Sequence, residues 1–147
     1  MVGAERIAKA AARRLVIAGG RRFHLDRRIR SVGGVDDRQK AQWLGRARAL
    51  LNPIRWEEPF GLNVTEALVS GCAVLASPLG SMPELVTPEV GFLCATDDEF
   101  VARIAELDRI APEACRQRAL SRFTHIQMAE AYVELYRRAA DGTLGAA

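Results

Sequence analysis

The chain has 147 residues, of which 49% are hydrophobic and 27% are charged. This is the size and composition of one ordinary globular domain rather than of a disordered chain. No apolar run approaches the roughly 20 residues that a membrane helix needs, and charged residues among the first ten argue against a signal peptide. The three cysteines stand far apart in the sequence, which excludes a disulfide framework or a zinc ribbon and indicates a reducing, cytoplasmic setting.

The net charge of +3 is unevenly distributed along the chain. Residues 1–55 carry 14 basic and four acidic side chains, whereas residues 56–147 carry seven basic and 14 acidic ones. A basic first part suits a polyanionic partner, either a nucleic acid or the phosphates of a nucleotide. The alternative is that the excess of arginine over lysine reflects genome composition and that most of these side chains are simply solvated.

The order of predicted elements is read from apolar runs, turn residues and helix caps. Caps followed three residues later by Gln or Glu mark four helix starts, at Asp36, Ser81, Thr96 and Thr124. In chain order, the sequence predicts a helix over 4–14, a strand over 15–18, an irregular connector over 21–28, a strand over 29–32, a helix after Asp36, a strand over 49–52, a loop over 53–60, a helix over 61–70, a strand over 73–76, a helical turn after Ser81, a strand over 91–93, a helix from Thr96 to about Leu107 and helices near Pro112 and after Thr124.

Short apolar strands that alternate with helices are typical of a parallel sheet with helices on both faces. We therefore predict an α/β, Rossmann-like three-layer domain over residues 1–140, followed by a flexible tail over 141–147. Ligands of such open sheets bind beyond the carboxyl ends of the strands. The loop there with the most unusual composition is 52–66, Asn-Pro-Ile-Arg-Trp-Glu-Glu-Pro-Phe-Gly-Leu-Asn-Val-Thr-Glu.

Loop 52–66 combines a helix start with two carboxylates. The backbone N–H groups that follow Gly61 form a helix N-terminus, which is suited to a phosphate. Glu58 lies just before this terminus and Glu66 lies about one and a half turns inside the helix, so the two carboxylates flank the same spot. A nucleoside-diphosphate sugar has hydroxyls on both sides of its phosphates and fits this pattern. The alternative is that the glutamates only complement the helix dipole or are solvated, and spacing alone favours that interpretation.

The residues around the two glutamates carry a more specific signal. Together they resemble the donor-site region of the retaining GT-B glycosyltransferases of the "group 1" family, and the resemblance covers about residues 4–138. The matching segments are Trp56-Glu-Glu-Pro-Phe-Gly-Leu62 with Glu66-Ala-Leu68, Gly71-Cys-Ala-Val-Leu-Ala-Ser77, Gly80-Ser-Met-Pro-Glu-Leu-Val86, Gly91-Phe-Leu93, Leu15-Val-Ile-Ala-Gly19, Val32-Gly-Gly-Val-Asp-Asp37, Arg122-Phe-Thr124 and Ala131-Tyr132 with Tyr136.

This resemblance implies a role for each matching residue. Glu58 would act as the catalytic residue that contacts hydroxyls of the transferred sugar, and Glu66 would bind the ribose. The segment Phe60, Gly61, Leu62 and Asn63 would bind the donor, with its backbone amides holding the diphosphate, and the loop from Gly33 to Val35 would lie against the base. The family transfers a sugar with retention at the anomeric carbon, usually without a metal or another cofactor, which suits a site built on positioning and charge stabilisation.

The sequence also departs from the family pattern. Ala73 stands where a proline is usual, and Asn63-Val64-Thr65 replaces an apolar triplet. Val2 occupies the place of a phosphate-binding lysine, and the strand before it is absent, as is the acceptor-binding half. Because that strand belongs between the strands at 15–18 and 49–52, we expect a closed-up sheet, a strand from another chain or a marginally stable fragment. We expect the chain alone to be inactive.

Other residues suggest weaker hypotheses. The arginine-rich cluster of residues 21–30 could bind nucleic acid by counterion release, although a solvated face is the preferred interpretation and no nucleic acid is expected as the main partner. A missing acceptor domain or other chain, an anionic membrane surface and a second copy stay open as partners beside the nucleotide-sugar donor. His24 and His125 are interpreted as structural or exposed, and Trp56 either as a wall of the sugar pocket or as a plug of its loop. A non-catalytic nucleotide-binding remnant is the rival function.

Overall fold

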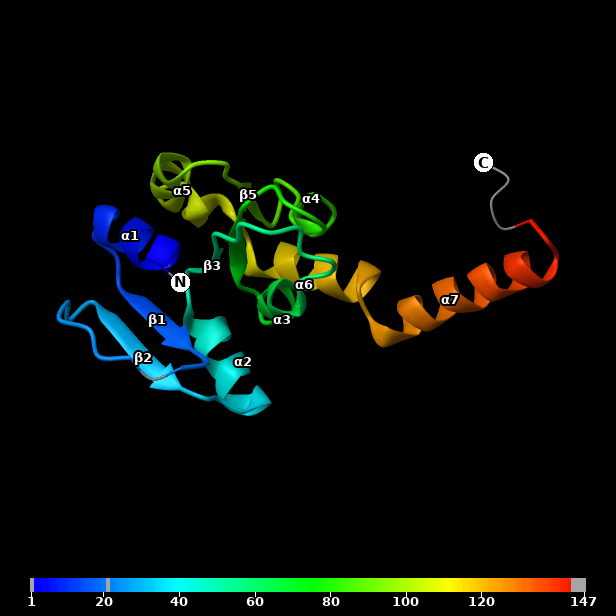
Figure 1. Cartoon of the computed structure of the whole chain (residues 1–147), viewed down its shortest axis with the longest axis horizontal. Helices are drawn as coiled ribbons and strands as arrows, with labels where there is room; N and C mark the ends of the chain where they lie inside the picture. The colour runs from blue at the N-terminus through cyan, green and yellow to red at the C-terminus, as the bar shows by residue number, and fades with distance from the viewer. Residues whose placement is uncertain (1, 21, 144–147) are drawn as a thin grey trace.

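The computed structural model describes residues 2–20 and 22–143. Figure 1 shows the chain as a body of strands and helices from which the last helix projects. Its elements are α1 (Val2–Ala10), β1 (Leu15–Ala18), β2 (Ile29–Gly33), α2 (Asp37–Arg46), β3 (Ala49–Asn52), α3 (Leu62–Val69), β4 (Ala73–Ala76), α4 (Met82–Leu85), β5 (Gly91–Leu93), α5 (Asp97–Ile104), the 3₁₀ turn η1 (Leu107–Arg109), α6 (Pro112–Arg122) and α7 (His125–Ala140). The order confirms the predicted alternation of strands and helices.

Most element boundaries agree with the predictions, and two helices end early. The helix expected over 4–14 stops at Ala10 because Ala12 takes a left-handed conformation with φ 52°. The Arg13 N–H then bonds to the Ala8 carbonyl at 2.9 Å, which satisfies the last helical turn. The helix expected to reach Leu107 ends at Ile104 and gives way to η1. Of the predicted tail, residues 144–147 lie outside the described residues.

The parallel strands form two separate sheets. β1 pairs with β2, and β3 pairs with β4, which pairs with β5, all in parallel. In the described part of the chain no ladder joins β1 to β3, so the expectation of a closed-up sheet is wrong.

Among the described residues, the edge of β1 away from β2 and the edge of β3 away from β4 have no partner strand. Leu15 and Gly19 donate their N–H groups to the β2 side, so strand alternation directs those of Val16 and Ala18 to the opposite edge. By the same alternation, the Asn52 carbonyl faces the β4 side, where it accepts from Ser77, and the backbone groups of Leu51 face away from β4.

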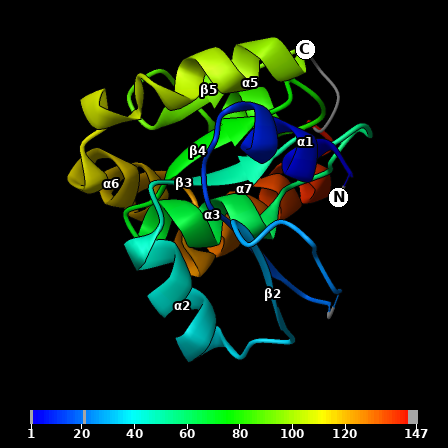
Figure 2. The same cartoon turned by 90° about the vertical axis from the view of Figure 1, so that its left-hand side faces the viewer.

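The core lies on both faces of β4, which is buried along its whole length. Val74 and Ala76 pack in the cluster that contains residues of α3, α4 and α6. Ala73 and Leu75 face the other way, into the cluster that contains Ile7 of α1 and Phe100 of α5. Figure 2 shows the resulting layers, with α1 and α5 on one side of the β3–β4–β5 sheet and α3 and α6 on the other.

The start of α1 lies at the carboxyl end of β3. A Cβ on Gly3 would stand 3.6 Å from Cγ of Pro53, the residue that follows β3. Arg6 on the next turn of α1 pairs with Asp97, and this pair ties α1 to α5. The chain therefore enters α1 at the edge of the sheet where loops that follow the strands collect.

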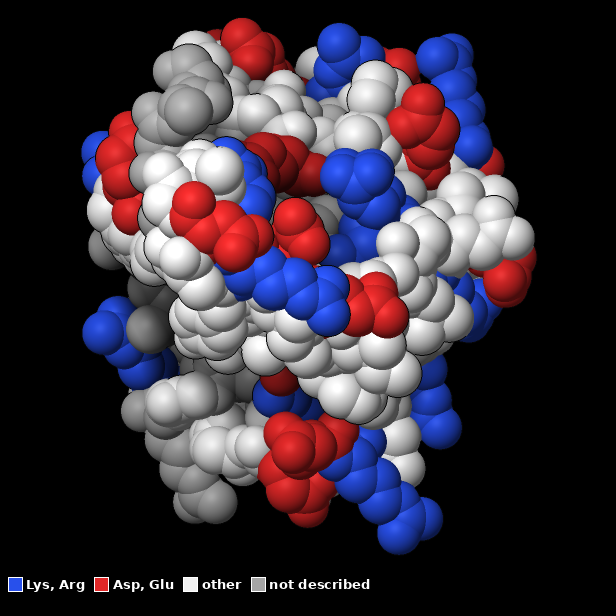
Figure 3. All heavy atoms as spheres, turned by 90° about the vertical axis from the view of Figure 1, so that its right-hand side faces the viewer, with Lys and Arg blue, Asp and Glu red and all other residues white. Residues whose placement is uncertain are grey.

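The last helix, α7, makes few contacts with the body. It begins at a capping box formed by Thr124 and Gln127 and contains no buried residue. Seen from this end of the molecule, basic and acidic side chains are interspersed over the surface (Figure 3). Across residues 2–20 and 22–143, no helix is both long and apolar enough to cross a bilayer.

Candidate functional site

Two loops that follow neighbouring strands are fastened together at the carboxyl edge of the sheet. The loop after β3 contains Glu58 and Phe60, and the loop after β4 contains Gly80 and Ser81. The Ser81 N–H donates to the Glu58 carbonyl at 2.8 Å, and the Ser81 hydroxyl donates to the Phe60 carbonyl at 2.7 Å. The prediction that the Ser81 side chain caps α4 is therefore wrong, because that hydroxyl is used between the loops.

Gly61 shapes the start of α3. It is the N-cap residue, it is buried, and its φ of 87° lies in the left-handed region, where glycine is favoured. A Cβ at this position would stand 2.6 Å from Cε of Met82. The N–H groups of Leu62 and Asn63 have no hydrogen-bond partner among the described residues. The helix start thus presents free donors and the positive end of the helix dipole.

A polar pair under this helix start explains one departure from the family pattern. The Asn63 side chain donates to Oδ1 of Asn52 at 3.1 Å, and Nδ2 of Asn52 lies 3.4 Å from Sδ of Met82. Asn52 is buried at the end of β3, where an amide without a partner would be costly. Asn63 therefore fixes the start of α3 to β3. Asn52 was missed as a site residue, although an asparagine that closes an apolar strand was a usable signal.

Glu58 is held by its neighbour in the same loop. Nε1 of Trp56 donates to Oε2 of Glu58 at 3.0 Å. The Trp56 side chain is largely exposed, so the interpretation of Trp56 as a plug is wrong. Phe60 packs edge-on against Phe123, with ring centroids 6.4 Å apart, so the aromatic residue expected to bind the donor also anchors the end of α6 to this loop.

Glu66 is held by a lysine from a different helix. Nζ of Lys40, on α2, donates to Oε1 of Glu66 at 2.6 Å and lies 3.2 Å from Oδ1 of Asp37. These two carboxylates raise the pKa of Lys40, so the side chain stays a cation throughout the neutral range. The sequence analysis did not single out Lys40, because the pairing depends on how α2 packs beside α3.

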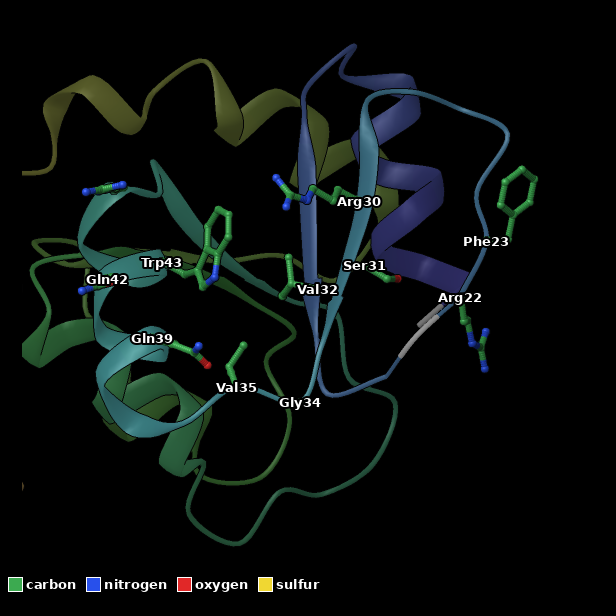
Figure 4. Close-up of a pocket in the computed structure, with 11 residues that line it drawn as sticks. Arg22, Phe23, Arg30, Ser31, Val32, Gly34, Val35, Gln39, Gln42 and Trp43 are labelled. Atoms are coloured by element: carbon green, nitrogen blue, oxygen red, sulfur yellow. The ribbon is translucent and has the colours of Figure 1, made fainter.

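The loop from Gly33 to Val35 lies beside an open hollow. Gly33 is buried with φ 77°, and Val35 lines a hollow of about 880 Å³ together with Trp43 of α2. Figure 4 shows Trp43, Gln39 and Val35 on the α2 side of β2, whereas Arg22 and Phe23 extend from the connector on the other side. The structure thus places the predicted base loop next to α2, the helix that carries Lys40.

A second, smaller hollow of about 340 Å³ lies beyond the carboxyl ends of β3, β4 and β5. Its walls come from the loops after these strands and from the start of α1, where Gly3 lies. It adjoins the fastened loops, and its lining includes Pro53, Arg55, Ser77, Leu79 and Asp97. The arrangement agrees with the expectation that the ligand crevice of this sheet lies at its carboxyl edge.

The described residues offer no reactive thiol and no cluster of potential metal ligands. Cys72, Cys94 and Cys115 are buried, and burial raises the pKa of Cys72 to about 12 and that of Cys94 to about 11. His24 hydrogen-bonds to Ser31 across the connector, as a structural histidine does. The carboxylates and backbone amides described above can position a ligand and stabilise charge.

We expect the buried thiols to make the fold sensitive to alkali. A thiol whose pKa is higher when folded than when unfolded contributes stability that is complete below its unfolded value, near 9, and is lost as pH rises towards the folded value. The free energy of unfolding, measured by urea titration, should be constant from pH 7 to 8.5 and then fall, with a slope of up to about 1.4 kcal/mol per pH unit for each thiol that ionises on unfolding. In C72A/C94A the fall above pH 9 should be clearly smaller, and an identical fall would contradict this origin.

The comparisons with known proteins show the family and the fold. The model of the family "Glycosyl transferases group 1" matches residues 3–109, and the chain belongs to this family. The fold is that of one half of a GT-B enzyme. The crystal structure of AviGT4, a glycosyltransferase involved in avilamycin A biosynthesis, is similar to this chain with a TM-score of 0.78 and 29% identity, over 96% of this chain and 48% of that one.

Three further proteins are similar to parts or most of this chain. A sucrose-phosphate synthase from Thermosynechococcus elongatus has a similar fold, with a TM-score of 0.77 and 23% identity over 93% of this chain and 42% of its own. An uncharacterised 41.2 kDa protein in the cps region of Klebsiella pneumoniae is 32% identical over 71% of this chain and 31% of its own length. A phosphatidyl-myo-inositol mannosyltransferase of Propionibacterium freudenreichii subsp. shermanii is 32% identical over 44% of this chain and 17% of its own. The chain thus spans less than half the length of each of these relatives.

Proposed function

We propose that this chain is the donor-binding half of a retaining glycosyltransferase, which holds a nucleoside-diphosphate sugar while the sugar is transferred to an acceptor. The start of α3 carries this proposal. It presents the N–H groups of Leu62 and Asn63, which have no partner among the described residues, between two carboxylates, Glu58 before the helix and Glu66 inside it. The N–H groups can donate hydrogen bonds to the diphosphate, and the flanking carboxylates can accept hydrogen bonds from the hydroxyl groups of the sugars on either side of it.

Each part of the donor has a candidate partner in this arrangement. The amides near Gly61 bind the diphosphate, Glu66 accepts hydrogen bonds from the ribose, and Glu58 accepts them from the transferred sugar. The base lies against the backbone of the loop from Gly33 to Val35, which borders the larger hollow. Transfer then depends on the positioning of the anomeric carbon and on stabilisation of the departing diphosphate, with no group of the chain required as a covalent nucleophile.

The acceptor is proposed to bind on another domain or chain. The described residues provide the carboxyl edge of one sheet, and the relatives that the chain matches are more than twice the length of the matched part. We therefore expect this chain to bind the donor without transferring the sugar. The rival function, a nucleotide-binding remnant without a catalytic partner, shares the same site and differs only in what docks on it.

We expect Glu66→Ala to weaken nucleotide binding by at least about tenfold, because the ribose loses a charged acceptor, which is worth roughly 1.5–3 kcal/mol. Calorimetric titration with UDP, GDP and ADP measures this effect, and Glu130→Ala, on the exposed face of α7, is a control of the same type that should leave the dissociation constant unchanged.

The donor-binding proposal is contradicted if the native chain binds none of the three nucleotides, or if Glu66→Ala and Glu130→Ala bind them equally well. Transfer of sugar to an acceptor by the isolated chain would contradict the expectation that the chain is incomplete. Salt-sensitive binding of DNA or RNA without any nucleotide binding would instead favour the basic cluster of residues 21–30.

A further inference from the structure

We infer that Lys40 and Trp56 are positioning residues, each of which holds one oxygen of a donor-site carboxylate and leaves the other oxygen for a sugar hydroxyl. This inference deepens the proposed function and depends on it. Lys40 engages Oε1 of Glu66 at 2.6 Å, and Trp56 engages Oε2 of Glu58 at 3.0 Å. In the described part of the chain, no hydrogen bond is made to Oε2 of Glu66 or to Oε1 of Glu58.

The benefit of such an arrangement is preorganisation. A glutamate side chain has three rotatable bonds, and fixing it in one conformation costs conformational entropy. When a donor from the protein already holds one oxygen, much of this cost is met before the ligand binds. Each carboxylate keeps enough lone pairs on its second oxygen to accept a sugar hydroxyl. The ammonium group of Lys40 and the indole N–H of Trp56 thus orient two carboxylate acceptors, one inside α3 and one before its start.

Lys40 has an additional electrostatic effect that Trp56 lacks. Glu66 lies near the point where the proposed diphosphate binds, and a bare carboxylate there would repel it. The Lys40 cation compensates this charge, whereas the neutral Trp56 indole only orients Glu58. The side chains of Lys40 and Glu66 are about one-third exposed, so solvent weakens the pair without removing it.

The positions of the two residues predict different effects on the two ends of the ligand. Lys40 acts at Glu66, the proposed ribose contact, so its loss should weaken a nucleotide and its sugar conjugate by the same factor. Trp56 acts at Glu58, the proposed contact of the transferred sugar, so its loss should weaken only the sugar conjugate. A merely structural role for Trp56 would weaken both ligands alike. For Lys40, the readouts that a merely structural role would not reproduce are rescue by Lys40→Arg and the double-mutant cycle with Glu66→Gln.

The experiment compares calorimetric dissociation constants of UDP with UDP-glucose and of GDP with GDP-mannose. For whichever of these two ligand pairs the native chain binds, we expect Lys40→Met to raise the dissociation constants of the nucleotide and of the nucleotide sugar about five- to tenfold. Lys40→Arg should restore most of the affinity. Trp56→Phe keeps an aromatic ring and removes the N–H, so it should raise only the constant of the nucleotide sugar. Arg38→Met removes an exposed cation from the same helix and is the matched control, and thermal melts verify that each variant is folded.

A double-mutant cycle decides whether Lys40 acts through Glu66. If it does, Lys40→Met adds nothing once Glu66→Gln is present, whereas additive losses would mean that Lys40 contacts the ligand itself and would overturn the inference. Native affinity in Lys40→Met, or equal effects of Trp56→Phe on both ligands, would also overturn it. If Glu66→Ala weakens binding and Lys40→Met does not, the inference fails alone. If the native chain binds no nucleotide, the proposed function fails together with it.

Discussion

Replacing Gly80 by alanine is expected to separate the two fastened loops and to remove donor binding. Gly80 has φ 59°, and a Cβ there would stand 2.3 Å from both the backbone N and the backbone O of Glu58. Backbone atoms cannot rotate away as a side chain can, so the loops must move apart. The Ser81 N–H would lose the Glu58 carbonyl, and the Gly80 N–H would lose the Glu57 carboxylate.

We expect Gly80→Ala to lower the thermal midpoint by roughly 5–10 °C, which corresponds to about 2 kcal/mol for a domain of this size, and to raise the nucleotide dissociation constant more than tenfold. Trp56 lies in the displaced loop, so its fluorescence should shift as well. Gly19→Ala is the matched control, because Gly19 also has a positive φ, 104°, but has nothing within 4 Å of an added Cβ. Equal binding by Gly80→Ala and the native chain would show that the loop contact does not shape the site.

Adding a strand ahead of α1 is expected to stabilise the protein strongly. The open edges of β1 and β3 both belong to parallel sheets, and α1 begins beside Pro53 at the carboxyl end of β3. A short apolar strand joined directly to Val2 would therefore end at the carboxyl edge of the sheet, where α1 begins. It could bond to both open edges, with a net gain of about 1 kcal/mol for each hydrogen bond.

We expect a chain extended by a Val/Ile-rich strand to melt at least about 10 °C higher than the native chain, because a few kcal/mol is a large part of the stability of one domain. Hydrogen exchange should show new protection at the N–H groups of Val16, Ala18 and Leu51. A Gly/Ser segment of equal length is the control and should change neither quantity. A sharp, cooperative melt of the dilute native monomer at the same temperature as the extended chain would contradict the idea that the open edges limit stability.

The elements could be predicted well from the sequence because each is bounded by strong local signals. The strands at 15–18, 49–52, 73–76 and 91–93 are short apolar runs, and the structure gives them the same limits. The capping boxes at Asp36 and Thr124 are formed as predicted, since both partners lie within one helical turn. Local chemistry was sufficient for these elements, although the hydrogen bond of Trp56 to Glu58, two residues away, was not predicted.

Most of the contacts that were missed join distant segments. The pairing of Lys40 with Glu66 spans 26 residues and depends on the packing of α2 against α3. The hydroxyl of Ser81 had a plausible local role as a cap, and only the approach of the other loop gives it a better acceptor at Phe60. The sequence likewise could not decide between a closed-up sheet, a strand from another chain and a marginally stable fragment. That choice depends on whether helix packing permits β1 and β3 to pair.

The helix α2 links the two sheets both in sequence and in space. The proposed base loop runs directly into it, and Lys40 on its second turn reaches Glu66 on the other side of the gap. A nucleotide that contacts both the base loop and α3 would favour one relative placement of the two sheets, and a strand inserted between β1 and β3 would favour the same placement. The two binding events would then be thermodynamically coupled, and by reciprocity each must tighten the other by the same factor.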